Sequence, residues 1–400
     1  MTKFLAFITP QHGHINPTLA VAHELIEHGE EIVYYVTDEF KQIIEATGAA
    51  FKPYISTATH MRAQTTHRSP SEDPFIGMIY ETIDEWRYVI SQIRDDVYAQ
   101  QADYIIYDSL LGKIFAQMLQ IPAIQFHSTY AFNNHFNLLV SQFHALSVGE
   151  TSVEFIAVNK YFEDFCALYK IPLNSYANLL TRIEPMNIVF LPRIFQPAFE
   201  SFDDSFKFVG PSIHPSLRRT QDFSLKRLRR KPTLYISLGT VFTNQIDFVH
   251  TCLQAFGNSP WQVIQSIGES LDRTAFEPIP ENFLVYQHLP QLDILPRTDI
   301  FITHGGMNSV MEALYYGVPM IAISQIPEQS FTAGQIVKFG LGIQLDKQNV
   351  TAKVLRETVS QVNEDKSFRI NAQNMQTIIK ESGGYKEAVK AILSFIEANK

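Results

Sequence analysis

Short apolar runs recur along the first half of the chain, separated by longer amphipathic stretches. The first run, 4–8, precedes a stretch in which apolar residues return at helical spacing up to Gly29. Asn16 and Pro17 suit the cap and the first position of that helix, so we expect it to begin near Thr18. The same reasoning predicts strands at 31–36, 104–108, 123–127 and 187–192 and a helix over 112–119.

A second series of the same kind follows residue 232. Strands are predicted at 233–240, 261–267, 283–286, 299–303, 319–324 and 342–345. The segments 55–100 and 128–180 look like helical or loop-like insertions, and the stretch from Val354 to Lys400 looks wholly helical. Strands that alternate with helices are typical of parallel sheets, so the predicted fold class is α/β.

The two series are separated by a segment of different character. A chain of 400 residues is long enough for two domains. Residues 209–232 carry prolines, serines and a basic cluster at 226–231, which we interpret as a solvated linker rather than a site for an acidic partner. The expected organisation is an N-terminal domain over 1–210, a linker over 211–232 and a C-terminal domain over 233–385.

Composition and charge exclude several classes of function. The net charge of −9 argues against a general nucleic-acid binder, which needs a basic face. Cys166 and Cys252, the two cysteines, rule out a disulfide framework and a cysteine-rich zinc site. The first apolar run is too short for a signal-peptide core, and no apolar stretch approaches the roughly 20 residues of a membrane span. We therefore expect a soluble, cytoplasmic protein.

The strongest chemical signal is the segment 301–329, "FITHGGMNSVMEALYYGVPMIAISQIPEQ". A strand runs into the His304 turn, whose glycines allow close approach of a ligand, and the following helix offers its N-terminus to an anion. Glu312, one turn into the helix, could accept from vicinal hydroxyls, although a solvated helix face explains it equally well. Glu328 and Gln329 are expected in a loop at the carboxyl edge of the sheet. The set suits a phosphate, a ribose and a polyhydroxylated group.

This segment resembles the donor-binding signature of the UDP-dependent glycosyltransferases of the GT-B fold, and the bacterial macrolide-glycosyltransferase branch is especially similar. Supporting matches are "HGHINP" (12–17), "YISLGT" (235–240) and "LPQLDIL" (289–295). The resemblance implies two Rossmann-like α/β domains that face each other across a cleft. The first would bind the acceptor and the second the UDP-sugar, with the helix 386–400 packing back on the first domain.

The resemblance also assigns roles. It implies that His14 is the general base and that Asp108 is its partner, although Asp108 alone could be a helix cap. His12 has no expected chemical role. The implied donor-binding residues are Gly13, Gly239, Thr240, His288, Leu289, Gln291, His304, Gly306, Asn308, Ser309, Glu312, Glu328 and Gln329.

Three positions depart from the family pattern. Many relatives place Trp where His288 stands, so base stacking is expected to be weaker and nucleotide preference looser. Met307 replaces a Trp that is frequent in the plant enzymes. Glu328 stands where Asp is common, and its reach to sugar hydroxyls differs by one methylene.

The implied reaction is inverting transfer of a sugar, expected to be glucose because of Gln329, from a UDP-sugar to a hydroxyl. UDP-sugar is a co-substrate, and neither a metal nor another cofactor is required. The acceptor is expected to be an apolar, hydroxylated small molecule of the natural-product kind, and no nucleic-acid or membrane partner is expected. The N-terminal half holds aromatic residues of which most are expected in the core, with the rest available to line the acceptor pocket: Phe75, Tyr80, Trp86, Phe132, Phe136 and Phe143.

Rival functions remain at this point. A UDP-sugar epimerase or hydrolase of the same fold should carry more carboxylates around the sugar than Glu328 provides. A non-catalytic nucleotide-sugar binding protein would not need the His14 and Asp108 pair. An NAD-dependent dehydrogenase is disfavoured because the first turn reads "TPQHGHINP" rather than GxGxxG.

Overall fold

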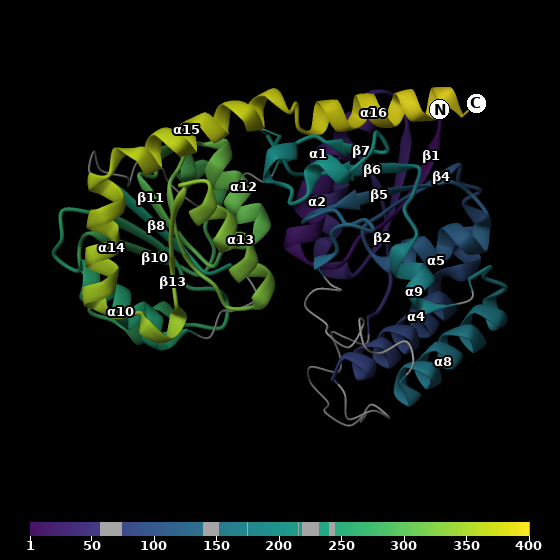
Figure 1. Cartoon of the computed structure of the whole chain (residues 1–400), viewed down its shortest axis with the longest axis horizontal. Helices are drawn as coiled ribbons and strands as arrows, with labels where there is room; N and C mark the ends of the chain where they lie inside the picture. Colours follow the sequence, from purple (N-terminus) through teal and green to yellow (C-terminus); the bar gives the residue numbers. More distant parts are fainter. Residues whose placement is uncertain are drawn as a thin grey trace. The chain divides into compact units, whose positions relative to one another are not determined.

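The chain folds into two compact units in the computed structural model (Figure 1). The structure describes residues 1–56, 74–138, 152–173, 175–214, 216–217, 232–239 and 245–399. One unit is Met1–Ser212 together with Tyr385–Lys400, and the other is Ile213–Gly384. Most of the predicted linker, including the basic cluster at 226–231, lies outside the described residues.

The first unit is built on a fully parallel sheet of order β3-β2-β1-β4-β5-β6-β7 within the described residues. Most of its strands are buried apolar runs, as expected for parallel strands covered on both faces. Strand order reverses between β1 and β4, so the carboxyl ends of these strands flank a topological switch point. The strands are β1 Lys3–Phe7, β2 Glu31–Val36, β3 Ala50–Pro53, β4 Tyr104–Tyr107, β5 Ala123–His127, β6 Met186–Val189 and β7 Phe206–Phe208.

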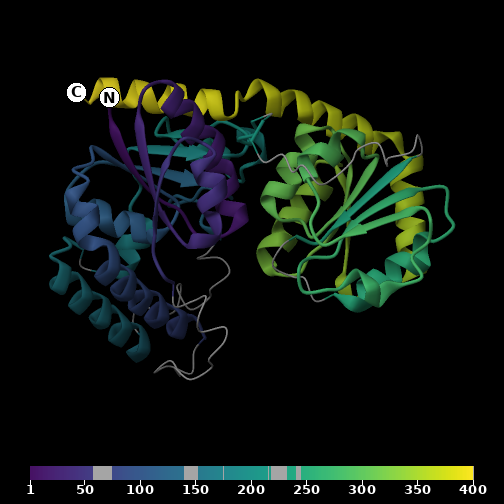
Figure 2. The same cartoon turned by 180° about the vertical axis from the view of Figure 1, so that it is seen from behind.

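Helices cover both faces of this sheet. On one face α4, α5, α8 and α9 share a single apolar core with β1, β2 and β4, and α4 contributes a stripe at helical spacing that includes Ile83, Trp86 and Ile90. On the other face α1 contacts α16, as Figure 2 shows from behind. The helices are α1 His12–Glu27, α2 Lys41–Glu45, α4 Pro74–Ala99, α5 Leu110–Leu119, α8 Val153–Tyr169, α9 Tyr176–Thr181 and α16 Tyr385–Ala398.

The second unit repeats this plan with a parallel sheet of order β10-β9-β8-β11-β12-β13 within the described residues. Its switch point lies between β8 and β11. Helices α10 and α14 pack on one face, and α12 and α13 lie on the other (Figure 1). The strands are β8 Thr233–Ser237, β9 Gln262–Ser266, β10 Phe283–Tyr286, β11 Ile300–Thr303, β12 Met320–Ile323 and β13 Gly342–Leu345. The helices are α10 Ile246–Phe256, α11 Gln291–Ile294, α12 Met307–Tyr315, α13 Pro327–Lys338, α14 Ala352–Glu364 and α15 Lys366–Glu381.

The first helix begins earlier than predicted. It starts at His12 rather than near Thr18, because the N–H groups of His14 and Ile15 bond to the Gln11 carbonyl at 2.9 Å and close a turn there. Pro17 therefore lies inside the helix, where its missing N–H removes one backbone bond, and Asn16 is not the cap. The histidine-containing turn is thus the first turn of a helix.

The tail is helical almost throughout its described residues, as predicted. It is divided into three helices, because Asp365 caps α15 through its carboxylate and the pair Gly383 and Gly384 adopts positive φ before α16. The strands β3 and β7 were not predicted. Both are short edge strands, whose few residues give little hydrophobic signal.

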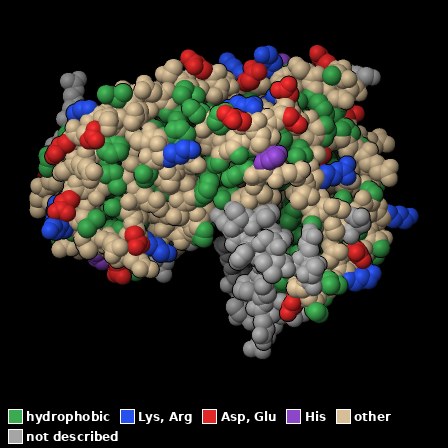
Figure 3. Space-filling model, viewed as in Figure 1, with side chains coloured by type: hydrophobic (Ala, Val, Ile, Leu, Met, Phe, Trp, Pro, Cys, Tyr) green, Lys and Arg blue, Asp and Glu red, His purple; other side chains and the backbone are tan. Residues whose placement is uncertain are grey.

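Charged side chains of both signs are interspersed on the face that Figure 3 shows. This mixture fits the modest negative charge and gives no basic stripe on that face. Among the described residues, no helix is both long and apolar enough to cross a membrane.

Candidate active site

Residues at the carboxyl ends of three adjacent strands form one part of the candidate site. The strands β1, β4 and β5 are neighbours in their sheet. Asp108 directly follows β4 and Ser128 directly follows β5, while His14 lies in the first turn of α1, which comes after β1. The fold therefore gathers these side chains at a switch point, where open α/β sheets bind ligands.

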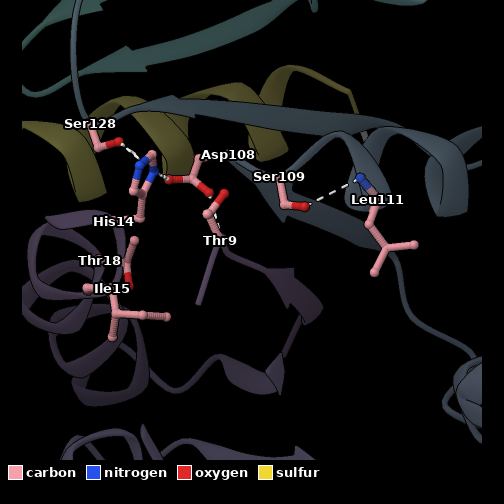
Figure 4. A network of polar contacts seen from close by, with 8 residues as sticks. All are labelled: Thr9, His14, Ile15, Thr18, Asp108, Ser109, Leu111 and Ser128. Atoms are coloured by element: carbon pink, nitrogen blue, oxygen red, sulfur yellow. Dashed lines mark hydrogen bonds and ion pairs between the residues drawn. The ribbon is translucent and has the colours of Figure 1, made fainter. Parts of the chain in front are cut away.

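His14 and Asp108 form a hydrogen-bonded pair (Figure 4). Nδ1 of His14 lies 2.5 Å from Oδ2 of Asp108, and Oδ1 of Asp108 accepts the backbone N–H of Thr9 at 2.8 Å. The Asp108 side chain is 4% exposed and that of His14 is 32% exposed. An ionised carboxylate only accepts hydrogen bonds, so the imidazole proton belongs on Nδ1 and Nε2 is the nitrogen that can take a proton.

Ser128 also belongs to this group and was missed by sequence reasoning. Its Oγ lies 2.9 Å from Nδ1 of His14 and 3.3 Å from Oδ2 of Asp108, and the residue is buried. The sequence signal was a serine directly after a predicted strand, which gains meaning once β5 is known to lie beside β4. The three side chains are not a nucleophilic triad, because serine and aspartate here meet the same ring nitrogen.

The alternative role of Asp108 as a helix cap is excluded. The cap of α5 is the next residue, Ser109, whose Oγ accepts the N–H of Leu111 at 3.3 Å (Figure 4). Both oxygens of Asp108 face residues of the β1 and β5 ends instead.

Three buried titratable side chains that interact with Asp108 carry no charge at neutral pH. Burial lowers the pKa of His127 to about 4, although its hydrogen bond to Asn187 opposes this. Burial raises the pKa of Tyr34 and of Tyr54 well above the usual value for a phenol. The charge of Asp108 is therefore not offset by these three groups.

In the second unit, the turns after β8 and β11 meet around the ring of His304. A Cβ at position 239 would lie 2.7 Å from Cε1 of His304, and a Cβ at position 306 would lie 2.3 Å from its Nε2. Gly239 also has a φ of +83°, which other residues rarely adopt. Glycine is thus required at both positions if the His304 ring is to stay in this place.

His304 is a neutral ring beside a helix N-terminus. Burial lowers its pKa to about 4, and its Nδ1 is inaccessible and has no hydrogen-bond partner among the described residues. Gly306 is the N-cap of α12, so Asn308 and Ser309 lie in the first turn, where N–H groups are available to an anion. These groups can hold a diphosphate through hydrogen-bond donation and the helix dipole rather than through a formal positive charge.

Gln291 connects two predicted donor-binding residues with one that was not predicted. Its Nε2 lies 2.7 Å from Oε2 of Glu312 and 3.5 Å from Oγ of Ser309, and its Oε1 accepts the hydroxyl of Tyr235 at 3.3 Å. Glu312 is buried, which contradicts its reading as part of a solvated helix face. The Tyr235 hydroxyl fixes the amide orientation of Gln291, which then directs its NH₂ group at the Glu312 carboxylate.

His288 and Leu289 precede α11. Nε2 of His288 lies 2.9 Å from Oε1 of Glu269, and both side chains are largely exposed. Leu289 is half-buried. An exposed imidazole held by a carboxylate offers only a small aromatic face at this position.

Glu328 and Gln329 lie in the first turn of α13, not in a loop as predicted. Pro327 occupies the first helical position, which suits its missing N–H. Gln329 is buried, and its Oε1 accepts the N–H of Gln325 at 2.9 Å. Because Oε1 of Gln329 faces the N–H of Gln325, the NH₂ end of this amide points away from Gln325.

The remaining predicted residues are distributed as follows. Gly13 is exposed in the first turn of α1, and His12 packs edge-on against Phe40 with ring centroids 5.2 Å apart. Thr240 lies outside the described residues. Apart from Gly13, the described donor-binding residues all belong to the second unit, whereas the His14 and Asp108 pair belongs to the first.

The aromatic residues expected near the acceptor have different environments. Trp86 is a core residue, and Tyr80 packs against the same core. Phe132 and Phe136 are half-buried beyond β5, where Phe132 meets His127 edge-on with centroids 5.5 Å apart. Phe143 and the side chain of Phe75 lie outside the described residues. Of the described aromatic residues in the predicted set, Phe132 and Phe136 alone are outside the core cluster and its packed neighbours.

The described part of the chain contains no group of three or more His, Cys, Asp or Glu side chains placed to hold a metal ion. The expectation that no metal is needed stays a prediction.

Comparisons with known proteins agree on one family. Residues 229–383 match the family model described as UDP-glucoronosyl and UDP-glucosyl transferase. The chain is 38% identical over 393 residues to the NDP-glycosyltransferase YjiC of Bacillus licheniformis, covering 98% of this chain and 96% of that protein. It is 25% identical to the oleandomycin glycosyltransferase of Streptomyces antibioticus over 96% of this chain and 89% of that protein.

Solved structures agree with this result. The crystal structure of the calicheamicin glycosyltransferase CalG4 matches with a TM-score of 0.83 and 26% identity, over 100% of this chain and 99% of that one. The predicted α/β fold with two Rossmann-like units is confirmed. The chain is a glycosyltransferase and belongs to the UDP-glucoronosyl and UDP-glucosyl transferase family.

Proposed function

We propose that this enzyme transfers glucose from UDP-glucose to a hydroxyl group of an apolar small molecule, with inversion at the anomeric carbon. The first unit would bind the acceptor and the second the nucleotide sugar. The observation that carries this proposal is the His14 and Asp108 pair, joined at 2.5 Å at the switch point of the first sheet. A protein that only bound nucleotide sugars would need no such base.

The proposed step uses the two ring nitrogens of His14 differently. Nε2 takes the proton of the acceptor hydroxyl while that oxygen attacks the anomeric carbon, and the bond from this carbon to the diphosphate oxygen breaks. Asp108, buried and bonded to Nδ1, stabilises the imidazolium that forms. Attack from the face opposite the leaving group gives a β-glycoside from an α-linked donor.

The leaving diphosphate gains negative charge, and the second unit offers donors to receive it. The His304 ring, the N–H groups at the start of α12 and the hydroxyl of Ser309 are already in place before reaction. Preorganised donors of this kind lower the barrier because they need not reorient as charge develops.

Support for the donor and acceptor comes from residues and relatives together. Glu312 would accept from the ribose hydroxyls, and Glu328 and Gln329 would bind the sugar. A relative 31% identical to this chain carries the name uncharacterized UDP-glucosyltransferase YojK, whereas YjiC carries the broader name NDP-glycosyltransferase. The macrolide and calicheamicin enzymes support a natural-product acceptor with a large apolar surface.

The test is a panel of phenols, flavonoids, macrolides and steroids incubated with UDP-glucose, UDP-galactose, UDP-N-acetylglucosamine or TDP-glucose. Mass spectrometry detects the product, and the anomeric proton coupling in NMR gives its configuration. We expect β-glucosides, with UDP-glucose the fastest donor. An α-glycoside product would refute inversion, and faster use of a galactosyl or amino-sugar donor would refute the sugar assignment.

A further inference from the structure

Ser128 completes a closed triangle of polar atoms with the two residues of the proposed catalytic pair. The edges of the triangle are 2.5 Å from His14 Nδ1 to Asp108 Oδ2, 2.9 Å from Ser128 Oγ to His14 Nδ1 and 3.3 Å from Ser128 Oγ to Asp108 Oδ2. Figure 4 shows Ser128 reaching the imidazole from the side opposite α1. The serine is buried and comes from a third strand end, so it is held independently of its two partners.

We propose that Ser128 is a positioning residue for sugar transfer, whose hydroxyl donates to Asp108 and so tunes the basicity and orientation of His14. This inference rests on the proposed role of His14 as the general base. In this role Ser128 acts through His14 and Asp108 and is not itself a nucleophile.

The proton on Nδ1 of His14 determines the direction of the hydrogen bond that the Ser128 hydroxyl makes. Nδ1 of His14 carries a proton that points at the Asp108 carboxylate, so it cannot receive the proton of the serine hydroxyl. The hydroxyl must therefore donate to Oδ2 of Asp108, with its lone pairs toward the Nδ1–H group. Asp108 then accepts three hydrogen bonds, from the N–H of Thr9, from His14 and from Ser128.

Removing the serine donor should make His14 more basic. A carboxylate that accepts fewer hydrogen bonds keeps more of its negative charge for the imidazolium, which raises the pKa of the histidine. The bond from Nδ1–H to the serine lone pair acts in the opposite direction, but this proton is already shared with the closer, charged Asp108. We therefore expect the pKa of His14 to rise when the hydroxyl is lost.

The groups that face the pair do not mask this effect. Tyr34 from β2, Tyr54 beyond β3 and His127 from β5 all lie near enough to feel the charge of Asp108. Their pKa values, raised for the tyrosines and lowered to about 4 for His127, keep them neutral from pH 5 to 9. On α1 itself, His12 is exposed, packs against Phe40 and is unchanged in all the variants proposed below.

The experiment compares Ser128→Ala with Ser109→Ala. Ser109 is a serine that directly follows Asp108, but its Oγ caps α5 and does not contact His14. For Ser128→Ala we expect the acidic limb of the kcat profile to move up by about 0.5 to 1 pH unit, a three- to tenfold loss below the midpoint. Above the midpoint the rate should return to within about threefold of wild type, and the acceptor KM should stay unchanged. Ser109→Ala should keep the wild-type midpoint.

A second readout is independent of turnover. In protein labelled with ¹³C at histidine Cε1, the His14 signal is the one that His14→Gln removes, and its titration midpoint should rise by the same amount in Ser128→Ala. Ser128→Thr, which keeps a hydroxyl, should restore the wild-type midpoint. If Ser128→Thr does not fold, Ser128→Cys replaces it, and its weaker S–H donor should also raise the midpoint.

The outcomes separate the two proposals. A His14→Gln variant that keeps wild-type turnover would overturn the general base itself. If His14→Gln is inactive and the midpoint of Ser128→Ala stays within about 0.2 unit of wild type or falls, the role of Ser128 alone is wrong. A uniform loss of rate at every pH, with an unmoved His14 signal, would equally reduce Ser128 to a packing residue.

Discussion

The imidazole of His304 lies so close to Gly306 that a Cβ at position 306 would stand 2.3 Å from its Nε2. A separation below 3 Å cannot be tolerated between these atoms, so the ring and a side chain exclude each other. The absence of a side chain at position 306 therefore leaves the space that the ring of His304, the proposed diphosphate ligand, occupies. Gly306 also lies at the N-cap of α12, next to the proposed anion site.

Gly306→Ala should displace the His304 ring and raise the KM for the nucleotide sugar at least tenfold. Gly334→Ala is the matched control, because Gly334 lies exposed in α13 and a Cβ there would meet no atom within 4 Å. That change should leave kinetics unaltered and stabilise the protein by about 0.5–1 kcal/mol. Calorimetric titration with UDP checks both variants, and equal UDP affinity in the two would contradict the role of Gly306.

Local structure could be predicted from the sequence where the residues concerned are close together in the chain. The glycine turn after β11 and the first turn of α12 were predicted within one or two residues, because strand, turn and helix follow one another directly. The prediction failed where two local preferences competed. Pro17 favours a first helical position, yet the carbonyl of Gln11 closes a turn there, and the helix begins at His12, six residues before Thr18.

Contacts between distant segments could not be predicted from the pattern of the chain. The pairing of His14 with Asp108 was predicted only through the family resemblance, and the structure places these two side chains in contact. Ser128 acquires its meaning from the neighbouring strand β4, and the order of strands is a property of the folded sheet. The amide of Gln291 reaches Glu312 and Tyr235 across 21 and 56 residues of sequence. Hydrophobic periodicity carries no information about such pairs, since it reports the faces of single elements.

Replacing the proposed base should abolish turnover while sparing donor binding. His14→Ala is expected to lower kcat by about 10²- to 10⁴-fold, the usual contribution of general-base catalysis. UDP affinity should stay within about twofold, since the residues proposed to bind the phosphates lie in the second unit. His12→Ala, two residues earlier and exposed on the same turn, should retain wild-type turnover. A His14→Ala enzyme within threefold of the wild-type rate would disprove the assignment.

Asp108→Asn should be nearly as damaging as loss of the histidine. The aspartate uses one oxygen for the N–H of Thr9 and the other for His14. An asparagine has one acceptor oxygen, so its NH₂ must face either the Thr9 N–H or Nδ1. If the NH₂ group faces Nδ1, it donates to that nitrogen. The imidazole proton must then lie on Nε2, and the ring cannot act as the base.

We expect a kcat at least 100-fold lower for Asp108→Asn, with an unchanged melting temperature to within a few degrees. Asp103→Asn is the control, because Asp103 accepts the N–H of Lys3 at the opposite end of the same pair of strands. Normal transfer by both Asp108→Asn and Asp108→Ala would remove the aspartate from the mechanism.

Acid should destabilise the first unit through His127. The pKa of this buried histidine is about 4 in the folded state and about 6.5 in the unfolded chain, so the unfolded state binds more protons between these values. The contribution of His127 to the free energy of unfolding is therefore complete above pH 6.5 and is lost as the pH falls toward 4. Between pH 7 and pH 5 the loss is about 2 kcal/mol.

His127→Gln, which keeps a donor for Asn187, should remove that part of the pH dependence. Trp86 lies in the core of the first unit, so its fluorescence in a Trp261→Phe background follows the urea unfolding of that unit. An exposed histidine, changed in His28→Gln, provides the control. Equal losses of unfolding free energy in His127→Gln and wild type between pH 7 and 5 would contradict the prediction.

Sugar transfer should not depend on a divalent metal. Mg²⁺ is held by oxygen ligands together with substrate phosphates, whereas the groups proposed to face the diphosphate are hydrogen-bond donors. These are the neutral ring of His304, the hydroxyl of Ser309 and the N–H groups at the start of α12. The nearest carboxylate in the same motif, Glu312, is bonded to Gln291 and is assigned to the ribose.

Activity after dialysis against EDTA should therefore equal that of the untreated enzyme, and added Mg²⁺ or Mn²⁺ should not raise it. The measurement is the initial rate at saturating acceptor with the nucleotide sugar varied around its KM, because a weakly bound metal would reveal itself as a change in KM before kcat. The His304→Ala variant is a useful companion. If donors alone hold the diphosphate, its raised KM should not be lowered by millimolar Mg²⁺. Loss of activity in EDTA that Mg²⁺ or Mn²⁺ restores would show that a cation, and not this set of donors, neutralises the leaving group.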